Sequence, residues 1–202
     1  MIITFDIHGV LFTPDYKKIF LLLVRNLKAL QLCMYAAHPR FIKNMVRLLK
    51  KKAVPEEYIE FLTQSFKRFK PYKNLALELA NAQKPNYAVF EIVKKLKAQG
   101  HTLHIFSNIG GTILQHLSEK HPELLSHFDT FFVPTQENGY LSKPNPLAFD
   151  HYVQNHNPEN KYLIFIDNRR HNVHISRHYG IHGIHFKSVP LLEQALSHLY
   201  LH

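Results

Sequence analysis

The stretch MIITFDIHGVLF, residues 1–12, begins with the features of a short strand and continues into a turn. Its first five residues are mostly β-branched or aromatic, which favours a buried strand. Asp6 follows at once, and Gly9 supplies the conformational freedom that a tight turn requires. In open α/β sheets, ligands bind beyond the carboxyl ends of the strands. The stretch therefore predicts both the first strand of a sheet and the first residue of a functional site.

Four later runs share this length and apolar character. They are HTLHIF (101–106), TFFVP (130–134), KYLIFI (161–166) and GIHGIHF (180–186). Helical patterns lie between strands, since apolar residues recur at i, i+3, i+4 and i+7 from Val89 to Leu96 before Gly100 ends the pattern. This alternation indicates a Rossmann-like α/β core with a parallel sheet.

Residues 14–85 interrupt the alternation. Helical spacing prevails there, for example from Leu23 to Met34, and no run has the character of a strand. The segment holds 15 of the 25 Lys and Arg residues but only 5 of the 15 Asp and Glu residues, so it carries the whole excess of the +10 net charge. The expected domains are an α/β core domain, 1–13 and 86–202, and a small all-helical cap domain, 14–85.

Composition restricts the class of protein. A single cysteine, Cys33, excludes an internal disulfide and a clustered zinc-thiolate site, which favours a reducing compartment. The amino terminus has no basic segment ahead of an apolar run, and the run IFLLLV (19–24) is too short to cross a bilayer. We therefore expect a cytoplasmic protein without a membrane partner.

Polar residues occur at four points along the core, each in a distinct local context. Asp6 follows the first strand, Ser107 and Asn108 lie in IFSN, Lys143 lies in SKPNP ahead of a helix, and Asp167 lies in IFIDNRRHN. This order of motifs resembles the haloacid dehalogenase (HAD) superfamily of hydrolases. The resemblance covers residues 1–13 and about 86–190, and it implies that the helical insert is the cap of that superfamily.

The residue types suit phosphoryl transfer. A carboxylate that attacks a phosphoryl group needs cations and hydrogen-bond donors around the phosphate oxygens. Asp6 is the predicted nucleophile, and Lys143 and Ser107 are predicted to bind the phosphate through charge and a hydroxyl. Asn108 and Gly9, which lie beside these residues in the sequence, are also expected to contact the substrate.

His8 stands where phosphatases of the resembled superfamily have a second Asp, which protonates the leaving group and then activates water. The resemblance also implies that the backbone carbonyl at this position binds Mg²⁺, and histidine supplies that carbonyl as aspartate does. Asp6 and Asp167 are the other expected ligands of this hard, oxygen-preferring cation. An imidazole is a common general acid or base, so we predict a catalytic role for His8, with a slower rate or a lower pH optimum.

The segment after Asp167 departs from the superfamily as well, because Asn168 stands where many members have a second acid. Asn168 is expected to orient the predicted lysine or to bind a metal-bound water, with a modest affinity for Mg²⁺. The chain has 16 histidines, and His171, His174 and His178 share one face of the next helix. A transition-metal site there is the alternative to solvated surface histidines, but apart from Asp167 no nearby Cys, Asp or Glu completes a ligand set.

We therefore expect a Mg²⁺-dependent phosphatase that acts on a small phosphorylated metabolite through an aspartyl-phosphate. The basic cap either attracts this substrate or only solvates helix surfaces. Aromatic residues among its cations, Phe66, Phe69 and Tyr72, leave nucleic-acid binding as a less favoured alternative. Two other functions stay open. One is a weakly active or inactive protein that binds a phosphorylated ligand or protein partner; the other is a 2-haloacid dehalogenase-like hydrolase, which is disfavoured because that branch has an aromatic residue where His8 stands.

Overall fold

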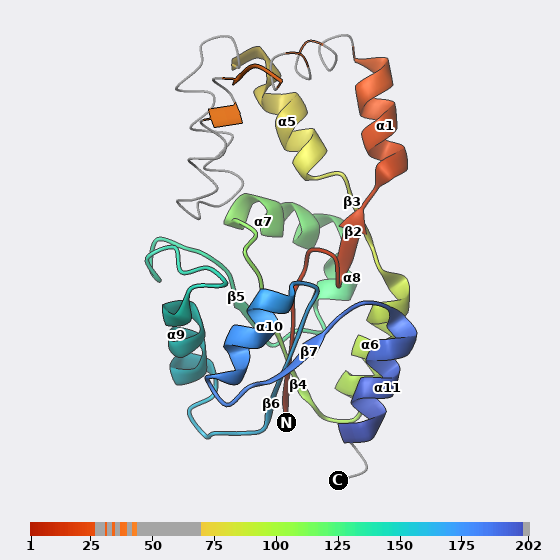
Figure 1. Ribbon diagram of the computed structural model, residues 1–202. Coiled ribbons are helices and arrows are strands. Elements are labelled where there is room, and N and C mark those ends of the chain that lie inside the picture. The colour runs from red at the N-terminus through yellow and green to blue at the C-terminus, as the bar shows by residue number, and fades with distance from the viewer. Residues whose placement is uncertain (27–30, 32–33, 35–36, 40–41, 44–69, 200–202) are drawn as a thin grey trace.

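The computed structural model describes the core and both ends of the inserted segment (Figure 1). The described residues are 1–26, 31, 34, 37–39, 42–43 and 70–199. Among them, no helix has the length and apolar character needed to cross a membrane.

A five-stranded parallel sheet forms the core, as the sequence predicted. Its strands are β1 (Ile2–Phe5), β4 (Thr102–Phe106), β5 (Thr130–Phe132), β6 (Leu163–Asp167) and β7 (His182–His185), in the order β5-β4-β1-β6-β7. The first strand lies in the middle and pairs with β4 on one side and β6 on the other. The strand order reverses at this point, so β1 ends at the switch point where α/β folds place their ligands.

Helices cover both faces of the sheet (Figure 1). On one face lie α6 (Tyr87–Ala98) and α11 (Val189–Leu199), and on the other lie α9 (Pro146–His156) and α10 (Arg170–Arg177). Between β4 and β5 the chain forms α7 (Gly111–Lys120) and the short α8 (Pro122–Leu125). The predicted helix before Gly100 is confirmed, and this glycine follows the end of α6 with a φ of +82°.

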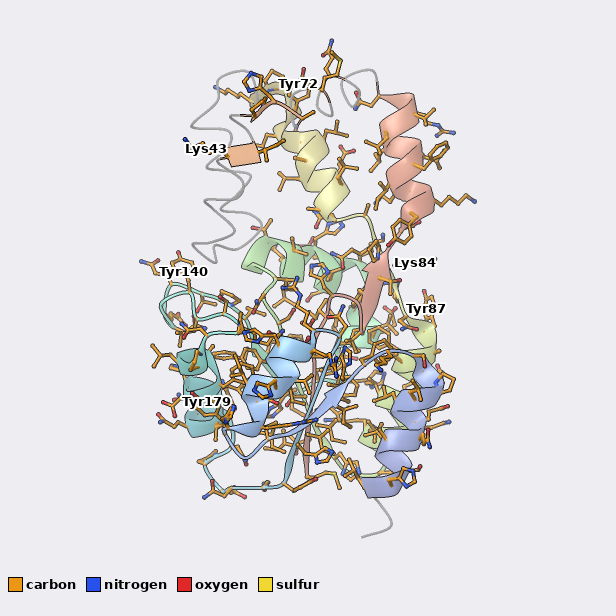
Figure 2. The ribbon with its side chains drawn as sticks, in the orientation of Figure 1. Lys43, Tyr72, Lys84, Tyr87, Tyr140 and Tyr179 are labelled. Atoms are coloured by element: carbon orange, nitrogen blue, oxygen red, sulfur yellow. The ribbon has the colours of Figure 1, made fainter. Side chains whose placement is uncertain are left out.

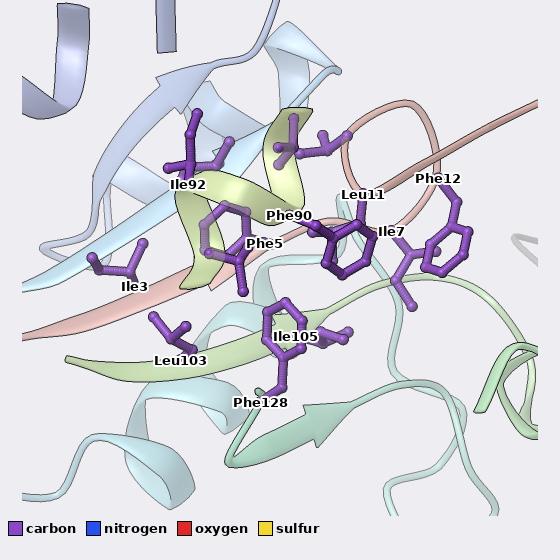
Figure 3. Packing of buried hydrophobic residues seen from close by; sticks show 14 of the residues in the cluster. Ile3, Phe5, Ile7, Leu11, Phe12, Phe90, Ile92, Leu103, Ile105 and Phe128 are labelled. Carbon is purple, nitrogen blue, oxygen red and sulfur yellow. The ribbon is translucent and has the colours of Figure 1, made fainter. Parts of the chain in front are cut away.

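Aromatic and aliphatic side chains pack together around β1, β4 and α6 (Figure 3). The rings of Phe5 and Phe128 meet edge to face at 6.0 Å, and those of Phe12 and Phe90 do so at 5.5 Å. All of these side chains are buried. Such packing fixes β1, and therefore the residues that follow it, in one position.

The inserted segment begins and ends in a two-stranded antiparallel ribbon, which the sequence analysis did not predict. β2 (Phe12–Pro14) pairs with β3 (Gln83–Pro85), and Figure 2 shows Lys84 of this ribbon where the chain returns to the core. Three further elements are described beyond the ribbon: α1 (Tyr16–Arg25), η1 (Lys70–Tyr72) and α5 (Lys73–Ala80). Figure 1 places α1 and α5 above the carboxyl ends of the sheet strands.

The described part of the insert agrees in type with the predicted helices, while its bounds as a domain stay a prediction. Asp15 caps α1 by accepting a hydrogen bond from the backbone N of Lys18 at 3.0 Å. Half of the predicted helical run from Leu23 to Met34 lies outside the described residues, as do Phe66 and Phe69.

Candidate active site

The turn after β1 delivers Asp6 to the carboxyl edge of the sheet. The backbone N of Asp6 donates to the carbonyl of Ile166 at 2.9 Å, which continues the pairing with β6. Gly9 adopts a φ of +80°, a conformation that side chains other than glycine rarely take. Its N–H donates to the carbonyl of Phe12 at 2.7 Å and so closes the turn. The glycine in the opening stretch is therefore required by the backbone.

The carboxylate of Asp6 is held at one of its two oxygens. Ser107 Oγ donates to Oδ1 at 2.8 Å, and Lys143 Nζ lies 3.1 Å from the same atom. No group among the described residues donates a hydrogen bond to Oδ2. The side chain is buried apart from a small exposed fraction. One oxygen is thus oriented, and the other keeps its lone pairs.

Lys143 joins the two carboxylates of the site. Its Nζ donates to Asp167 Oδ2 at 2.7 Å and to the carbonyl of Phe106 at 2.5 Å, besides its contact with Asp6. The ammonium also lies over the rings of Phe106 and Phe165, 5.1 and 4.9 Å from their centroids. An ammonium has three protons. Two of them form hydrogen bonds, to Asp167 and to the Phe106 carbonyl, while the contact with Asp6 is an ion pair.

Asn108 fixes the backbone of Lys143. Its Oδ1 accepts from the Lys143 backbone N at 2.8 Å, and its Nδ2 donates to the Lys143 carbonyl at 2.5 Å. Because both groups of the amide serve the same residue, Asn108 aligns the loop before α9 with the end of β4. One amide proton of Asn108 remains for another acceptor.

Asp167 lies behind Lys143 and is fully buried. Its Oδ1 accepts from the backbone N of Arg169 at 2.7 Å, and its Oδ2 accepts from Asn172 Nδ2 at 2.9 Å. Asn172, itself buried, was not among the predicted site residues. The only sequence signal for it is a position five residues after a candidate carboxylate, on the helix that β6 leads into.

The predicted residues converge on a small hollow of about 40 Å³. It is lined by Asp6, His8, Ser107, Asn108, Lys143, Arg169 and Asn172. The structure thus brings five predicted residues around one space and places Asp167 just beneath it. Arg169, which the sequence analysis assigned no role, contributes an exposed cation at its rim. A space of this size admits a small group and not a whole organic substrate.

Asn168 packs against the turn that follows β1 and is not bonded to Lys143. Its side chain packs against the turn, since a Cβ built on Gly9 would lie 2.1 Å from Asn168 Nδ2. Among the described residues it forms no side-chain hydrogen bond to Lys143, whose ammonium bonds Asp167 and the Phe106 carbonyl. The backbone carbonyl of Asn168 instead lies 3.0 Å from His185 Nε2. The prediction that Asn168 orients the lysine is wrong, because Asp167 contacts the Lys143 ammonium and Asn172 in turn contacts Asp167. Its other expected role, binding a metal-bound water, stays a prediction.

The remaining oxygens of the two carboxylates fit a hard cation such as Mg²⁺. A carboxylate offers about four lone-pair sites. Those of Asp6 Oδ2 receive no hydrogen bond from the described residues, and Asp167 Oδ1 receives only the one from Arg169 N. The backbone carbonyl of His8 belongs to the same turn. The fit is therefore one of donor chemistry alone, and it is better for Asp6, which lines the hollow, than for the fully buried Asp167.

The histidines of α10 form no recognisable metal centre in the described part of the chain. The rings of His174 and His178 meet edge to face at 5.2 Å. No group of three or more His, Cys, Asp or Glu side chains in metal-binding geometry occurs among the described residues.

Comparison with solved structures identifies the fold. The chain superposes on a HAD family enzyme from Bacteroides thetaiotaomicron in complex with magnesium and inorganic phosphate, with a TM-score of 0.64, 13% identity and coverage of 92% of this chain and 93% of that one. An L-2-haloacid dehalogenase from Xanthobacter autotrophicus with covalently bound chloropropionic acid gives 0.62, 14%, 90% and 75%. A hydrolase from Streptococcus pneumoniae gives 0.60, 17%, 97% and 97%.

At these identities the likeness establishes the fold, and the predicted HAD-like architecture is confirmed. No protein-family model and no curated protein matches the sequence. The two chemistries named for the solved structures, phosphate with magnesium and a covalently bound chloropropionic acid, belong to those proteins.

Proposed function

We propose that the protein hydrolyses phosphate monoesters of small molecules, with Asp6 as the nucleophile. The observation that carries the proposal is the state of the Asp6 carboxylate. Ser107 and Lys143 hold Oδ1 at 2.8 and 3.1 Å, while Oδ2 accepts no hydrogen bond from the described residues. An oriented carboxylate with one available oxygen beside a hollow suits in-line attack on phosphorus. The attack forms the aspartyl-phosphate and releases the alcohol oxygen.

The residues around the hollow have two different roles toward the phosphate, according to which of their donors are already bonded. Two protons of Lys143 bond Asp167 and the Phe106 carbonyl, and the single hydroxyl proton of Ser107 bonds Asp6, so these residues mainly orient the nucleophile and lower its repulsion toward the phosphate. Direct donors come from Arg169, whose five guanidinium protons have no acidic partner among the described residues, and from the second amide proton of Asn108. Ser107 is then a positioning residue.

Proton transfer is assigned to His8, which lines the same hollow as Asp6. In the first step, its imidazolium donates a proton to the leaving alcohol oxygen. In the second step, the neutral imidazole takes a proton from the water that attacks the aspartyl-phosphate, and Asp6 is regenerated. Mg²⁺ bound by Asp6, Asp167 and the His8 carbonyl would neutralise charge on the phosphate oxygens.

The decisive experiment measures phosphate release from a panel of phosphate esters with Mg²⁺ between pH 5 and 8. Asp6→Asn is expected to abolish turnover, because the amide is a poor nucleophile. Asp150→Asn, a change of the same kind on the outside of α9, is expected to leave it unchanged. Absence of turnover with every ester, or an equal rate in Asp6→Asn, contradicts the proposal.

His8→Asp tests the proton-transfer assignment separately. If His8 is the working acid and base, replacement lowers the rate and moves the pH profile. A large gain in rate would instead mark the native site as impaired. Ligand-dependent thermal stabilisation without turnover would favour the alternative of a binding protein.

A second candidate is hydrolysis of a carbon–halogen bond. One observation favours it, namely the direct contact of Lys143 with Asp6. This contact places a positive charge at the nucleophile without a metal. Chloride release from 2-chloropropionate in the presence of a chelator, lost in Asp6→Asn, would support it over the phosphatase.

A further inference from the structure

A second, larger hollow lies on the outside of the core, between α10, the end of β7 and the beginning of α11. Its volume is about 450 Å³, which is within the range of small-molecule sites. It is lined by Arg170, Val173, His174, Arg177, His185, Lys187 and Leu191. None of these residues lines the hollow at Asp6.

The cations of this hollow come from two directions. Arg170, His174 and Arg177 follow one another at i, i+4 and i+7, so they share one face of α10. Opposite them, His185 ends β7 and Lys187 follows it ahead of α11. Figure 1 shows α10 lying alongside β7, as the contact between these elements requires. The basic side chains therefore face a common space and are not spread over a helix surface.

No Asp or Glu is among the described residues that line this hollow. Residues 168–192 contain four Lys or Arg residues and five histidines but no Asp or Glu, and the first acidic residue after them is the exposed Glu193 of α11. Among the described residues, neither Arg170 nor Lys187 forms an ion pair, and Arg177 donates only to the carbonyl of Gly183, at 3.3 Å. Concentrated cations without counter-charges repel one another and attract anions. Packing of the fold does not require them, since Arg170, Arg177 and Lys187 are exposed.

We propose that this hollow binds a small organic molecule that carries two phosphate groups. Arg170 and Arg177 lie seven residues apart on one helix, which corresponds to about 10 Å along its axis. With Lys187 on the opposite side, the cations enter the hollow from separate points, which suits a ligand with two anionic groups better than a single phosphate. Val173 and Leu191 supply apolar surface between the cations, where the carbon body of such a ligand lies. The proposal is independent of the reaction at Asp6.

Nucleic acid fits the hollow less well. Proteins that bind single strands without sequence preference combine cations with aromatic side chains on which bases stack. No Phe, Tyr or Trp side chain is among the residues that line this hollow.

The test is calorimetric titration of the full chain with 1,6-hexanediol bisphosphate, in an Asp6→Asn background that removes turnover. We expect one saturable site, with inorganic phosphate bound more weakly. The double variant Arg170→Gln/Arg177→Gln should weaken binding of the bisphosphate at least tenfold, and Arg170→Lys/Arg177→Lys should retain most of it.

The matched control is Lys95→Gln/Lys120→Gln, which removes two exposed charges from α6 and α7. It should leave binding unchanged. Absence of bisphosphate binding, or an equal loss in the control, overturns the proposal. Tighter binding of a short single-stranded oligonucleotide, lost in the same arginine variant, overturns it in favour of a nucleic-acid surface.

Discussion

Replacing Lys143 by methionine is expected to destabilise the fold strongly, and the expected size follows from the environment of its ammonium group. Methionine has a similar length, so little space is left empty. The charge, however, is lost from a buried position that contacts Asp6 at 3.1 Å and Asp167 at 2.7 Å. Two carboxylates then remain without their shared cation in a region that water scarcely reaches.

Removal of one partner from a buried ion pair typically costs about 3–5 kcal/mol, because the remaining charge stays buried without compensation. We expect a loss of that size in the free energy of unfolding for Lys143→Met. Lys97 provides the matched control, since it also contacts one carboxylate, Asp129 at 2.5 Å, but both side chains are more than a third exposed. A solvent-exposed pair contributes about 0–1 kcal/mol. Lys97→Met should therefore cost less than about 1 kcal/mol.

Urea denaturation followed by circular dichroism measures both variants, with the slope of the transition as a check that the unfolded state is unchanged. The variant Lys143→Met/Asp167→Asn should recover part of the lost stability, because it removes one of the two uncompensated charges. Equal midpoints for Lys143→Met and Lys97→Met would refute the argument that this buried ammonium is what holds the carboxylates together.

Three further outcomes are expected. Gly9→Ala should lower the free energy of unfolding by about 1–3 kcal/mol, because φ is positive and Asn168 must move. Gly139→Ala should cost less, because φ is also positive there but no atom lies within 4 Å of the new Cβ. Urea denaturation midpoints compare the two variants. Burial, with a contribution from the nearby His156, lowers the pKa of His104 to about 4. The unfolded chain therefore binds a proton below about pH 6.5 that the folded chain does not, so stability should fall by up to about 3 kcal/mol between pH 7 and 4, and less in His104→Gln. Arg169→Gln should raise KM for a phosphate ester more than it lowers kcat, as steady-state kinetics would show.

The sequence predicted the positions at the sheet edge well, for a physical reason. Asp6, Ser107 and Asp167 each follow a short apolar run, and the ends of adjacent parallel strands meet at one edge. Lys143 follows no strand, and its place was predicted from the order of motifs. Its ammonium contacts residues that are distant in the sequence. Asp6, for example, lies 137 residues before Lys143, and the Phe106 carbonyl lies at the end of another strand.

Other features left weaker traces in the sequence. β2 and β3 have three residues each, too few to show an alternating pattern, and they pair across 68 intervening residues. In the sequence, Asn172 has the character of an ordinary polar residue on a helix. Only the folded structure shows that its amide bonds Asp167. Short elements and single buried amides gain their meaning from long-range contacts, which local patterns do not encode.

The hydrogen-bond donors at the site distinguish between phosphate esters and haloacids as substrates, which the fold alone does not. Ser107 donates its hydroxyl proton to a hydrogen bond with Asp6, and two protons of Lys143 bond Asp167 and the Phe106 carbonyl, so further direct partners for an anionic substrate group come from the rim, where Arg169 stands. A phosphate dianion gains more from such a bidentate donor than a single carboxylate does, because it offers three oxygens to the planar guanidinium and to Asn108 together. The same rim gives a carbon-bound halogen no comparable partner. This difference in donors is the physical ground for placing phosphate esters ahead of haloacids as substrates.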